Sequence, residues 1–336
     1  MNSSKFQKSA FVLALIMFVF GASGTLAQSS RTTSPASNYP NAPIRFIVPF
    51  AAGSGNDIVA RRIGQLLSES LHQPLVMQNV GGAGGIIGMT QVTRSAPDGY
   101  TIGMGSPSTL AIAPYMMKNP PYDPIRDLAP VTLIAATPFI LVVHPSVPVN
   151  SLAELVAHAK ANPGKYNYSS AGKGTTHHLG VEMFNSIAGT DFAHVPFKGA
   201  APATIAVASG EIDMIFGPIL STVPFLQSKK LKALAVTSAQ RSPAVPSIPT
   251  IAESGYPGYQ SVNWYGIVAP RGTPAAIIER LNRETVRQLG TPEIRNQLAN
   301  SGAKVYGNTA KEFSDVIISE SANAKNVIKR LNLFIE

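Results

Sequence analysis

The sequence predicts an α/β protein of two lobes that enclose a ligand cleft, and three observations support this prediction. Apolar strand-like runs alternate with segments of helical periodicity over most of the 336 residues, a pattern typical of parallel sheets covered by helices on both faces. A glycine-rich turn at residues 49–57 joins one such strand to one such helix. Two proline-containing segments, 144–148 and 243–257, are suitable places for the chain to pass between lobes.

The expected strands are short apolar runs, and the expected helices carry apolar residues at every third or fourth position. We expect strands at 44–48, 75–79, 100–104, 131–135, 139–143, 166–169, 193–196, 212–216, 232–237 and 264–269. We expect helices at 57–71, 85–95, 151–161, 176–188, 200–209, 219–227, 274–289, 292–301 and 309–331. Both kinds of element recur along the whole chain, so each lobe should contain its own sheet and helices.

The proline-containing segments also set the expected lobe boundaries. The first of them follows two apolar runs that can carry the chain across a hinge, and the second interrupts the chain before its last expected strand. We therefore expect residues 39–142 and 263–336 to form the first lobe and residues 143–262 to form the second. Ligands of such folds bind beyond the carboxyl ends of the strands, so the expected site is a cleft between the lobes.

The first residues are expected to be a targeting segment. Lys5 and Lys8 precede an apolar core at residues 11–20, and Thr25-Leu26-Ala27 offers small residues for cleavage. Such a core is too short to span a bilayer as a helix, which needs about 20 residues. We expect residues 1–27 to be a removed secretory signal and residues 28–38 to be a flexible N-terminus. An uncleaved membrane anchor is the alternative.

Composition disfavours several classes of function. The formal net charge is +9, but only 13% of residues are charged. Apart from the loose cluster Lys229-Lys230-x-Lys232, no basic run is longer than a pair, so we expect no nucleic-acid binding. The absence of cysteine excludes disulfides, thiol catalysis and thiolate metal sites.

Catalytic, metal and cofactor motifs are also missing. The chain has no G-x-S-x-G elbow and no H-E-x-x-H. His177 and His178 are adjacent, so on a helix they point about 100° apart and do not chelate one metal easily. The glycine spacing at 81–88 departs from the dinucleotide fingerprint, and residues 172–175 lack the first glycine of a phosphate-binding loop. We expect no cofactor, no metal and no catalytic residue.

The glycine-rich turn after the first strand is the best candidate for a ligand site. Gly53 and Gly55 permit positive φ and close approach of a ligand, and Ser54 or Asn56 can cap the helix that follows. Free backbone N–H groups and the positive end of the helix would then form an anion site without a basic side chain. An ordinary strand–helix connection is the alternative. We expect Asp57 to serve the helix end, because a carboxylate aimed at the site would repel an anion.

A second turn of this kind, residues 166–176, precedes another expected helix. Thr175 and Thr176 can donate hydroxyl groups to a ligand or can cap that helix. The glycine-rich run 81–88 follows the second strand and is expected to line the same cleft. Two such loops that face each other would hold a small carboxylate.

Several motifs, in order, resemble the solute receptors of tripartite tricarboxylate transporters, the Bug (TctC-like) family. The resemblance covers residues 39–313, nearly the whole chain after the signal. The motifs are Pro49-Phe50-Ala51-Ala52-Gly53 through Asp57-Ile58-Val59-Ala60-Arg61, Gly82-Ala83-Gly84-Gly85, Ala96-Pro97-Asp98-Gly99-Tyr100-Thr101, His194-Val195-Pro196-Phe197-Lys198-Gly199, Pro249-Thr250-Ile251-Ala252-Glu253-Ser254-Gly255, Trp264-Tyr265-Gly266 and Ala269-Pro270-Arg271-Gly272-Thr273-Pro274.

The resemblance implies a two-lobed, type II periplasmic-binding-protein-like fold that closes on a small organic acid. It further implies a periplasmic protein that is a monomer and that delivers its ligand to the membrane permease of a tripartite transporter. Family members hold one carboxylate of the ligand with backbone amides and hydroxyls of both lobes. Two alternatives remain, namely an exported hydrolase or isomerase that uses Ser106, Ser170 or His177, and a receptor that presents its ligand to a signalling protein.

The expected ligand contacts combine the loop residues with those that the resemblance implies. They are Phe50, Ala52, Gly53, Ser54, Gly55, Asn56, Asp57, Gly84, Ser106, Ser170, Gly172, Thr175, Thr176, His177, Gly199, Ala200 and Ala201. The chain departs from the family pattern at Ser54 and Asn56, and at Gly217, where an aspartate is often found. These departures leave the far end of the ligand open: an amino acid, a dicarboxylate, an aromatic acid or an amide all remain possible.

Overall fold

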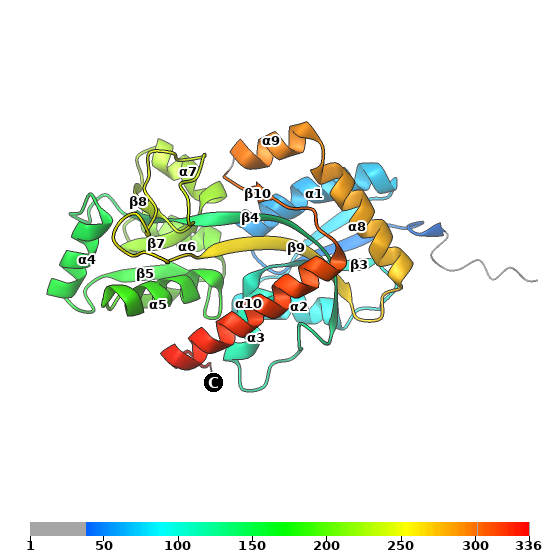
Figure 1. Cartoon of the computed structure of the whole chain (residues 1–336), viewed down its shortest axis with the longest axis horizontal. Helices are drawn as coiled ribbons and strands as arrows, with labels where there is room; N and C mark the ends of the chain where they lie inside the picture. The colour runs from blue at the N-terminus through cyan, green and yellow to red at the C-terminus, as the bar shows by residue number, and fades with distance from the viewer. Residues whose placement is uncertain (1–37, 301, 336) are drawn as a thin grey trace, which may run out of the picture. The chain divides into compact units, whose positions relative to one another are not determined.

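The computed structural model describes residues 38–300 and 302–335, and within them ten strands join into one hydrogen-bonded sheet (Figure 1). The strands are β1 (Ile44–Val48), β2 (Leu75–Asn79), β3 (Thr101–Gly105), β4 (Leu128–Val143), β5 (Asn167–Ser170), β6 (Ala193–Pro196), β7 (Met214–Pro218), β8 (Lys232–Val236), β9 (Val262–Pro270) and β10 (Lys304–Val305). The main order is β2-β1-β3-β9-β4-β7-β5-β6, and β8 and β10 both pair with β4.

The sheet is mixed, which corrects the expectation of purely parallel sheets. β1 pairs in parallel with β2 and β3, and β5 pairs in parallel with β6 and β7. The long strands β4 and β9, however, run antiparallel to each other and to β7 and β3. These two strands cross from one half of the sheet to the other. Below, β1–β3 with their helices are the first half, and β5–β8 with theirs are the second half.

β4 is one strand of 16 residues, not the two strands expected from the sequence. Pro138 lies between the two expected strands, and proline cannot donate to a central ladder. In the structure Pro138 lies where β4 changes partners: residues before it pair with β9, and Phe139 onward pairs with β7 and β8. Pro130 lies beside a shift of register with β9. Proline is therefore accommodated where the ladder is already interrupted.

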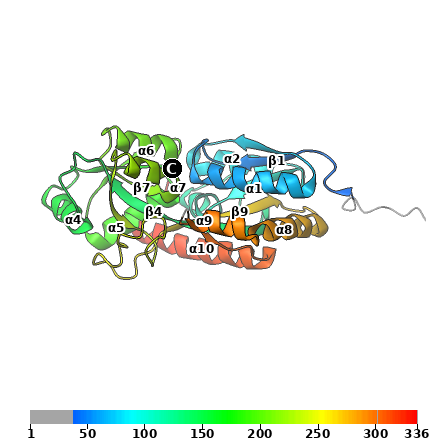
Figure 2. The same cartoon turned by 90° about the horizontal axis from the view of Figure 1, so that it is seen from above.

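Helices cover both faces of the sheet. The helical segments are α1 (Gly55–Leu71), η2 (Ala83–Gly85), α2 (Ile86–Thr93), η3 (Ser108–Ile112), α3 (Ala113–Met116), α4 (Leu152–Ala161), α5 (Thr176–Ala188), α6 (Ala200–Ala208), α7 (Ile219–Gln227), α8 (Ala275–Leu289), α9 (Pro292–Asn300) and α10 (Ala310–Leu331). Figure 2 shows α1 and α2 at one end and α4, α5 and α6 at the other, with β4 and β9 between. The sequence did not predict η3, α3 or β10.

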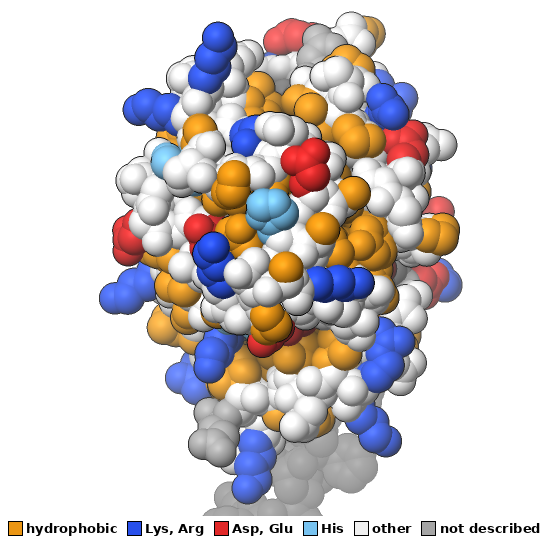
Figure 3. Space-filling view, turned by 90° about the vertical axis from the view of Figure 1, so that its left-hand side faces the viewer, with side chains coloured by type: hydrophobic (Ala, Val, Ile, Leu, Met, Phe, Trp, Pro, Cys, Tyr) orange, Lys and Arg blue, Asp and Glu red, His pale blue; other side chains and the backbone are white. Residues whose placement is uncertain are grey.

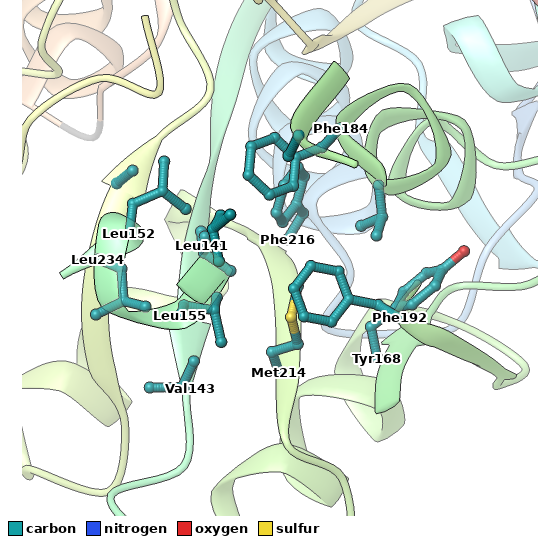
Figure 4. Packing of buried hydrophobic residues seen from close by; sticks show 14 of the residues in the cluster. Leu141, Val143, Leu152, Leu155, Tyr168, Phe184, Phe192, Met214, Phe216 and Leu234 are labelled. Carbon is teal, nitrogen blue, oxygen red and sulfur yellow. The ribbon is translucent and has the colours of Figure 1, made fainter. Parts of the chain in front are cut away.

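The core of the second half lies on both faces of its strands. Phe139, Leu141 and Val143 of β4 belong to one cluster, which includes the residues of α4 and α5 labelled in Figure 4. Ile140 and Val142 belong to another cluster, beneath α6 and α7. Successive side chains of a strand point to opposite faces, so this alternation shows that β4 is covered on both sides.

The first half has its own cluster, in which Trp264 of β9 packs edge-on against Phe313 of α10 at 5.5 Å between ring centroids. From Asn38 onward the chain forms one compact unit. The division into lobes after residues 142 and 262 stays a prediction. Apart from Asn38, the expected signal and flexible N-terminus lie outside the described residues. Within the described part, every helix is too short or too polar to span a bilayer.

Candidate ligand-binding site

The first glycine loop, residues 49–56, leaves β1 and leads into α1. Ser54 caps the helix, because its Oγ accepts a hydrogen bond from the N–H of Asp57 at 3.3 Å. Gly53 has a φ of +76°, and its N–H donates to Asp57 Oδ2 at 2.9 Å. Hydrogen bonds to residues at the start of α1 thus hold the loop in place. Ala52 is exposed on it, and the Gly53 N–H is not free for a ligand as the sequence led us to expect.

The Asp57 side chain holds this loop in place. It is buried, its Oδ2 also accepts from Arg61 Nε at 3.0 Å, and its Oδ1 accepts from Asn79 Nδ2 at 2.8 Å. Burial alone raises the pKa of the carboxyl, but the hydrogen bonds from Arg61, Gly53 and Asn79 outweigh burial and lower the pKa below its ordinary value. Asp57 therefore supports the loop as well as the helix end, and its carboxylate is used within the protein.

Gly55 is required for close approach rather than for positive φ, which corrects the expectation for this residue. A Cβ on Gly55 would lie 2.6 Å from the hydroxyl of Tyr265 and 3.6 Å from Cβ of Pro218. The N–H groups of Gly55 and Asn56 belong to the first turn of α1, where no intrahelical acceptor exists. They point, with the helix dipole, toward the start of the helix. These amides are the best anion donors of the first loop.

The second glycine loop, residues 170–175, is held by its own hydroxyl groups. Ser170 Oγ accepts from Gly172 N–H at 3.0 Å and lies 2.6 Å from His194 Nε2. Thr175 caps α5: its Oγ1 accepts from His178 N–H at 3.4 Å and donates to the carbonyl of Gly172 at 2.7 Å. The resemblance placed Ser170 among the ligand contacts, and the sequence allowed Thr175 either to contact the ligand or to cap the helix. In the structure both are used to fix the loop.

A chain of polar contacts joins the two halves next to these loops. Thr176 N–H donates to Ser108 Oγ at 3.0 Å, and the two hydroxyl oxygens lie 3.1 Å apart. Thr176 Oγ1 also donates to Asn263 Oδ1 at 3.3 Å, while Tyr265 OH lies 3.0 Å from Thr137 Oγ1. Ser108, Asn263, Tyr265 and Thr137 were not predicted as site residues. The sequence feature that could have identified them is that they are polar residues within or beside strongly apolar strands.

Three buried side chains near this chain of contacts have polar atoms without a protein partner. They are Asn56 through Oδ1, Ser106 through Oγ, and His177 through both ring nitrogens, and we call them the unpartnered groups. His177 packs against the ring of Phe139 at 4.6 Å, and burial lowers its pKa to about 3. Its imidazole is therefore neutral at pH 7. All three were expected as ligand contacts, and all three are available for that purpose.

The glycine run after β2 meets the second loop. Gly84 has a φ of +64°, and a Cβ there would lie 2.7 Å from the carbonyl oxygen of Lys173. A pocket of about 180 Å³ lies here, between residues 82–84 on one side and residues 171–173 on the other. Phe50 is buried, and its ring lies 3.1 Å from where a Cβ on Gly85 would be. Gly84 and Gly172 thus line one pocket, whereas Phe50 supports the loop beneath it.

The start of α6 faces the first loop. A Cβ on Gly199 would lie 3.1 Å from Cβ of Ala51, and one on Gly53 would lie 3.9 Å from Cβ of Ala201. Ala200 is buried, and its carbonyl accepts from a hydroxyl within α6. The small residues at 199–201 therefore allow the two halves to approach each other closely.

Apart from Asp57 and its partner Arg61, charged side chains do not hold the two loops in place. Lys173 and Lys198, the cations next to the pocket, are exposed. Figure 3 shows the outer end of the second half, away from the loops, where Lys, Arg, Asp and Glu side chains are scattered among apolar and uncharged groups. Within the described residues, no group of His, Asp and Glu side chains is arranged to hold a metal. Helix ends and hydroxyl groups are the main polar features of the site.

The Ser170–His194 hydrogen bond resembles a nucleophile and its base, but its surroundings oppose that role. Ser170 is fully buried and already bonded within the loop. His194 is stacked between Tyr168 and His178. Burial, with the positive charge of His178 and Lys173, lowers the pKa of His194 to about 3. A base with so low a pKa is a poor acceptor for a hydroxyl proton at neutral pH.

Known proteins resemble this chain over most of its length. The family model described as "Tripartite tricarboxylate transporter family receptor" matches residues 59–333. One similar solved structure, described as a periplasmic transporter, is 39% identical, with a TM-score of 0.86, and covers 89% of this chain and 100% of that one.

Two similar structures from Rhodopseudomonas palustris contain a ligand. The protein solved with adipate is 34% identical, with a TM-score of 0.85, and covers 88% of this chain and 98% of that one. MatC with bound malate is 32% identical, with a TM-score of 0.82, and covers 86% of this chain and 100% of that one.

Proposed function

Because this chain belongs to the tripartite tricarboxylate transporter family of receptors, we propose that it binds a small organic carboxylate between the two halves of its sheet and delivers it to a membrane permease. The family and the α/β periplasmic-binding-protein fold expected from the sequence are both confirmed. Members of this family are binding proteins and not enzymes. Adipate and malate in two similar structures support the ligand class.

The observation that carries the proposal is the pair of capped helix starts at the ends of parallel strands. α1 follows β1 and α5 follows β5, and Ser54 and Thr175 close their first turns. Backbone N–H groups at a helix start, together with the helix dipole, bind anions without a basic side chain. Thr176 connects α5 to the first half through Ser108, so the two helix starts belong to one polar region.

In this proposal, the residues predicted to contact the ligand form two groups, those that bind it and those that support the site. Gly55 donates its backbone N–H group, and Asn56, Ser106, Thr176 and His177 offer side-chain atoms to the ligand. The others shape or support the site without holding the ligand through their side chains. They are Phe50, Ala52, Gly53, Ser54, Asp57, Gly84, Ser170, Gly172, Thr175, Gly199, Ala200 and Ala201.

The proposed location is the periplasm, reached by cleavage of a signal at residues 1–27, and the proposed assembly state is a monomer. A lysine-containing start and a short apolar core support the signal. Mass spectrometry of the protein recovered from the periplasm should give a mature N-terminus near residue 28. Recovery of the uncleaved chain with the membranes would contradict the location.

Thermal shift against a panel of organic acids, including adipate and malate, tests the ligand class. A ligand that binds only the folded state stabilises it by about 2.7 kcal/mol at 100 times its dissociation constant. We expect at least one small carboxylate to raise the melting temperature by several degrees, and to be recovered unchanged after overnight incubation. No shift with any acid would contradict binding, and conversion of the acid would favour the hydrolase or isomerase alternative.

A further inference from the structure

We propose that the end of the ligand remote from its carboxylate carries a neutral hydrogen-bonding group, a hydroxyl or a carboxamide, held by His177, Asn56 and Ser106. This inference rests on the proposed function, since it concerns the same ligand. It specifies the chemical class that the sequence left open.

The first argument is the burial of the unpartnered groups. Only 7% of Asn56, 0% of Ser106 and 7% of His177 is exposed, and their free atoms have no hydrogen-bond partner among the described residues. Buried polar atoms in proteins are normally paired, because an unpaired one loses its hydrogen bonds to water without replacement. Three such groups in one region indicate a partner that is not part of the chain.

The second argument is that these groups converge. Asn56 follows Gly55, which lies against Tyr265 and Pro218. The ring of His177 packs on Phe139, and Phe139 pairs across the sheet with Pro218. Gly55, the residue before Asn56, and Phe139, the ring on which His177 packs, therefore both lie beside the same proline, Pro218.

Ser106 reaches this region from a third element. It follows Gly105, the last residue of β3, which pairs with Gly266 of β9, next to Tyr265. It also lies two residues before Ser108, the partner of Thr176. The unpartnered groups thus come from α1, the end of β3 and α5, and each is adjacent in sequence or in the sheet to the polar contacts between the halves.

The third argument is that the charged side chains closest in sequence to Asn56 and His177, namely Asp57 and Lys173, interact with other groups. The Asp57 carboxylate is already paired with Arg61. Lys173 acts on His178 and His194, whereas burial alone shifts the pKa of His177. In the proposed function the backbone N–H groups of the helix starts are used by the first carboxylate. A second carboxylate or an ammonium group beside these side chains would then be a buried charge without a partner, which is unfavourable.

The chemistry of the unpartnered groups selects the class of ligand. A neutral imidazole donates from one nitrogen and accepts at the other, an amide oxygen accepts, and a hydroxyl does both. A hydroxyl or carboxamide on the ligand can satisfy donors and acceptors at once, which a methyl group cannot. His177, Asn56 and Ser106 are therefore the residues that determine specificity at this end.

Isothermal titration calorimetry with ligands of equal length tests the inference. The four-carbon set is butyrate, 4-hydroxybutyrate, succinamate, succinate and 4-aminobutyrate, and the six-carbon set is hexanoate, 6-hydroxyhexanoate, adipamate, adipate and 6-aminohexanoate. In the set whose length fits, we expect the hydroxyl or carboxamide ligand to bind at least about tenfold more tightly than the methyl, carboxylate and ammonium ligands.

Variants of one residue sharpen the test. His177→Phe should remove most of the preference for hydroxyl over methyl, and His177→Gln should retain part of the preference. His158→Phe, on α4 and remote from the unpartnered groups, is the matched control. Circular dichroism and thermal melting verify that each variant folds.

The outcomes are distinct. Tightest binding of a dicarboxylate or an amino acid would overturn this inference and leave the proposed function standing. An unaltered preference in folded His177→Phe would also overturn it. Failure of every carboxylate to bind the folded wild-type protein would overturn the proposed function and this inference with it.

Discussion

The two glycine loops perform the same task with different chemistry. The first loop is held by a buried carboxylate, which accepts from Gly53 N–H, Arg61 and Asn79. The second loop is held by neutral groups, the hydroxyls of Ser170 and Thr175. Both loops follow a parallel strand and precede a capped helix. The same backbone arrangement can therefore be held by different kinds of side chain.

This difference predicts how each loop responds to acid. Hydrogen bonds to a charged group are stronger than neutral ones, but they depend on that charge. The second loop has no such charge, yet it lies next to the buried ring of His178 and the half-buried ring of His194. Acid should therefore disturb the second loop at a higher pH than the first.

The largest effect is expected where the first loop touches a crossing strand. Gly55→Val would place side-chain atoms within the space of the Tyr265 hydroxyl. We expect affinity to fall by at least about 100-fold, with a loss of about 1–3 kcal/mol in the free energy of unfolding. Calorimetry and urea unfolding measure the two effects. Ile58→Val, at an exposed position of the same helix, is the control, and unchanged affinity in Gly55→Val would place the site elsewhere.

The two loops should respond to acid at different pH values. Burial lowers the pKa of His177 to about 3 and that of His178 to about 4. Because the unfolded chain takes up protons near pH 6.5 and the folded chain does not, stability should fall as the pH drops below about 6.5. The slope is about 1.4 kcal/mol per pH unit for each of these residues, until the folded pKa is reached. Urea unfolding from pH 7 to pH 4.5 measures it.

The matched variant for this prediction is His178→Gln, which should reduce the slope by about 1.4 kcal/mol per pH unit. The first loop should respond only at lower pH. The folded pKa of Asp57 is lowered, so its contribution is complete above the unfolded value near 4 and disappears as the pH falls through the folded value. A flat stability between pH 6.5 and 4.5 would contradict the neutral burial of these histidines.

Asp57→Asn tests the charged support of the first loop. The amide retains one acceptor oxygen and turns a donor toward Gly53, Arg61 or Asn79. We expect a loss of about 1–3 kcal/mol in stability and a fall of about tenfold in affinity, because the loop is no longer held. Asp191→Asn at the surface is the control. If affinity is lost with no change in stability, the carboxylate acts on the ligand and not on the loop.

The smallest effects distinguish two neighbouring threonines of the second loop. Thr175→Ala should lower stability by about 1 kcal/mol through loss of the cap, and Thr175→Ser should restore it. Thr176→Ala should instead weaken binding by about fivefold, because its hydroxyl joins the two halves. Calorimetry and thermal melting on both variants decide between these roles. If Thr175→Ala weakened binding and Thr176→Ala lowered stability, the roles of the two threonines would be exchanged.

The sequence was sufficient for elements whose signals are local. The bounds of α5 and α7 were predicted correctly, because apolar periodicity and a preceding threonine or proline mark them. β4 was divided wrongly at Pro138, since the change of partner that accommodates the proline is a property of the whole sheet. Local patterns therefore locate elements better than they describe pairing.

The candidate site was likewise only partly predictable from the sequence. The glycine loops were located from sequence, and so were the cap at Ser54 and one of the two options for Thr175. Ser170 was expected to contact the ligand, and in the structure its hydroxyl bonds within its own loop. Asn263 and Tyr265 were missed, because an isolated polar residue in a strand gains a role only when distant segments meet beside it. Side-chain direction depends on tertiary contacts that no spacing encodes.

The position of Trp264 gives the protein an optical reporter of its own. It is the single tryptophan in the sequence, and it lies on β9 between Asn263 and Tyr265, with its indole turned to the opposite face and packed on Phe313. The indole is shielded from water, so its emission should be blue-shifted. Any bending of β9 on binding changes the angle of the two rings. Ligand titrations can therefore be followed by intrinsic fluorescence, with no attached dye, and Phe313→Leu should alter the signal more than the affinity.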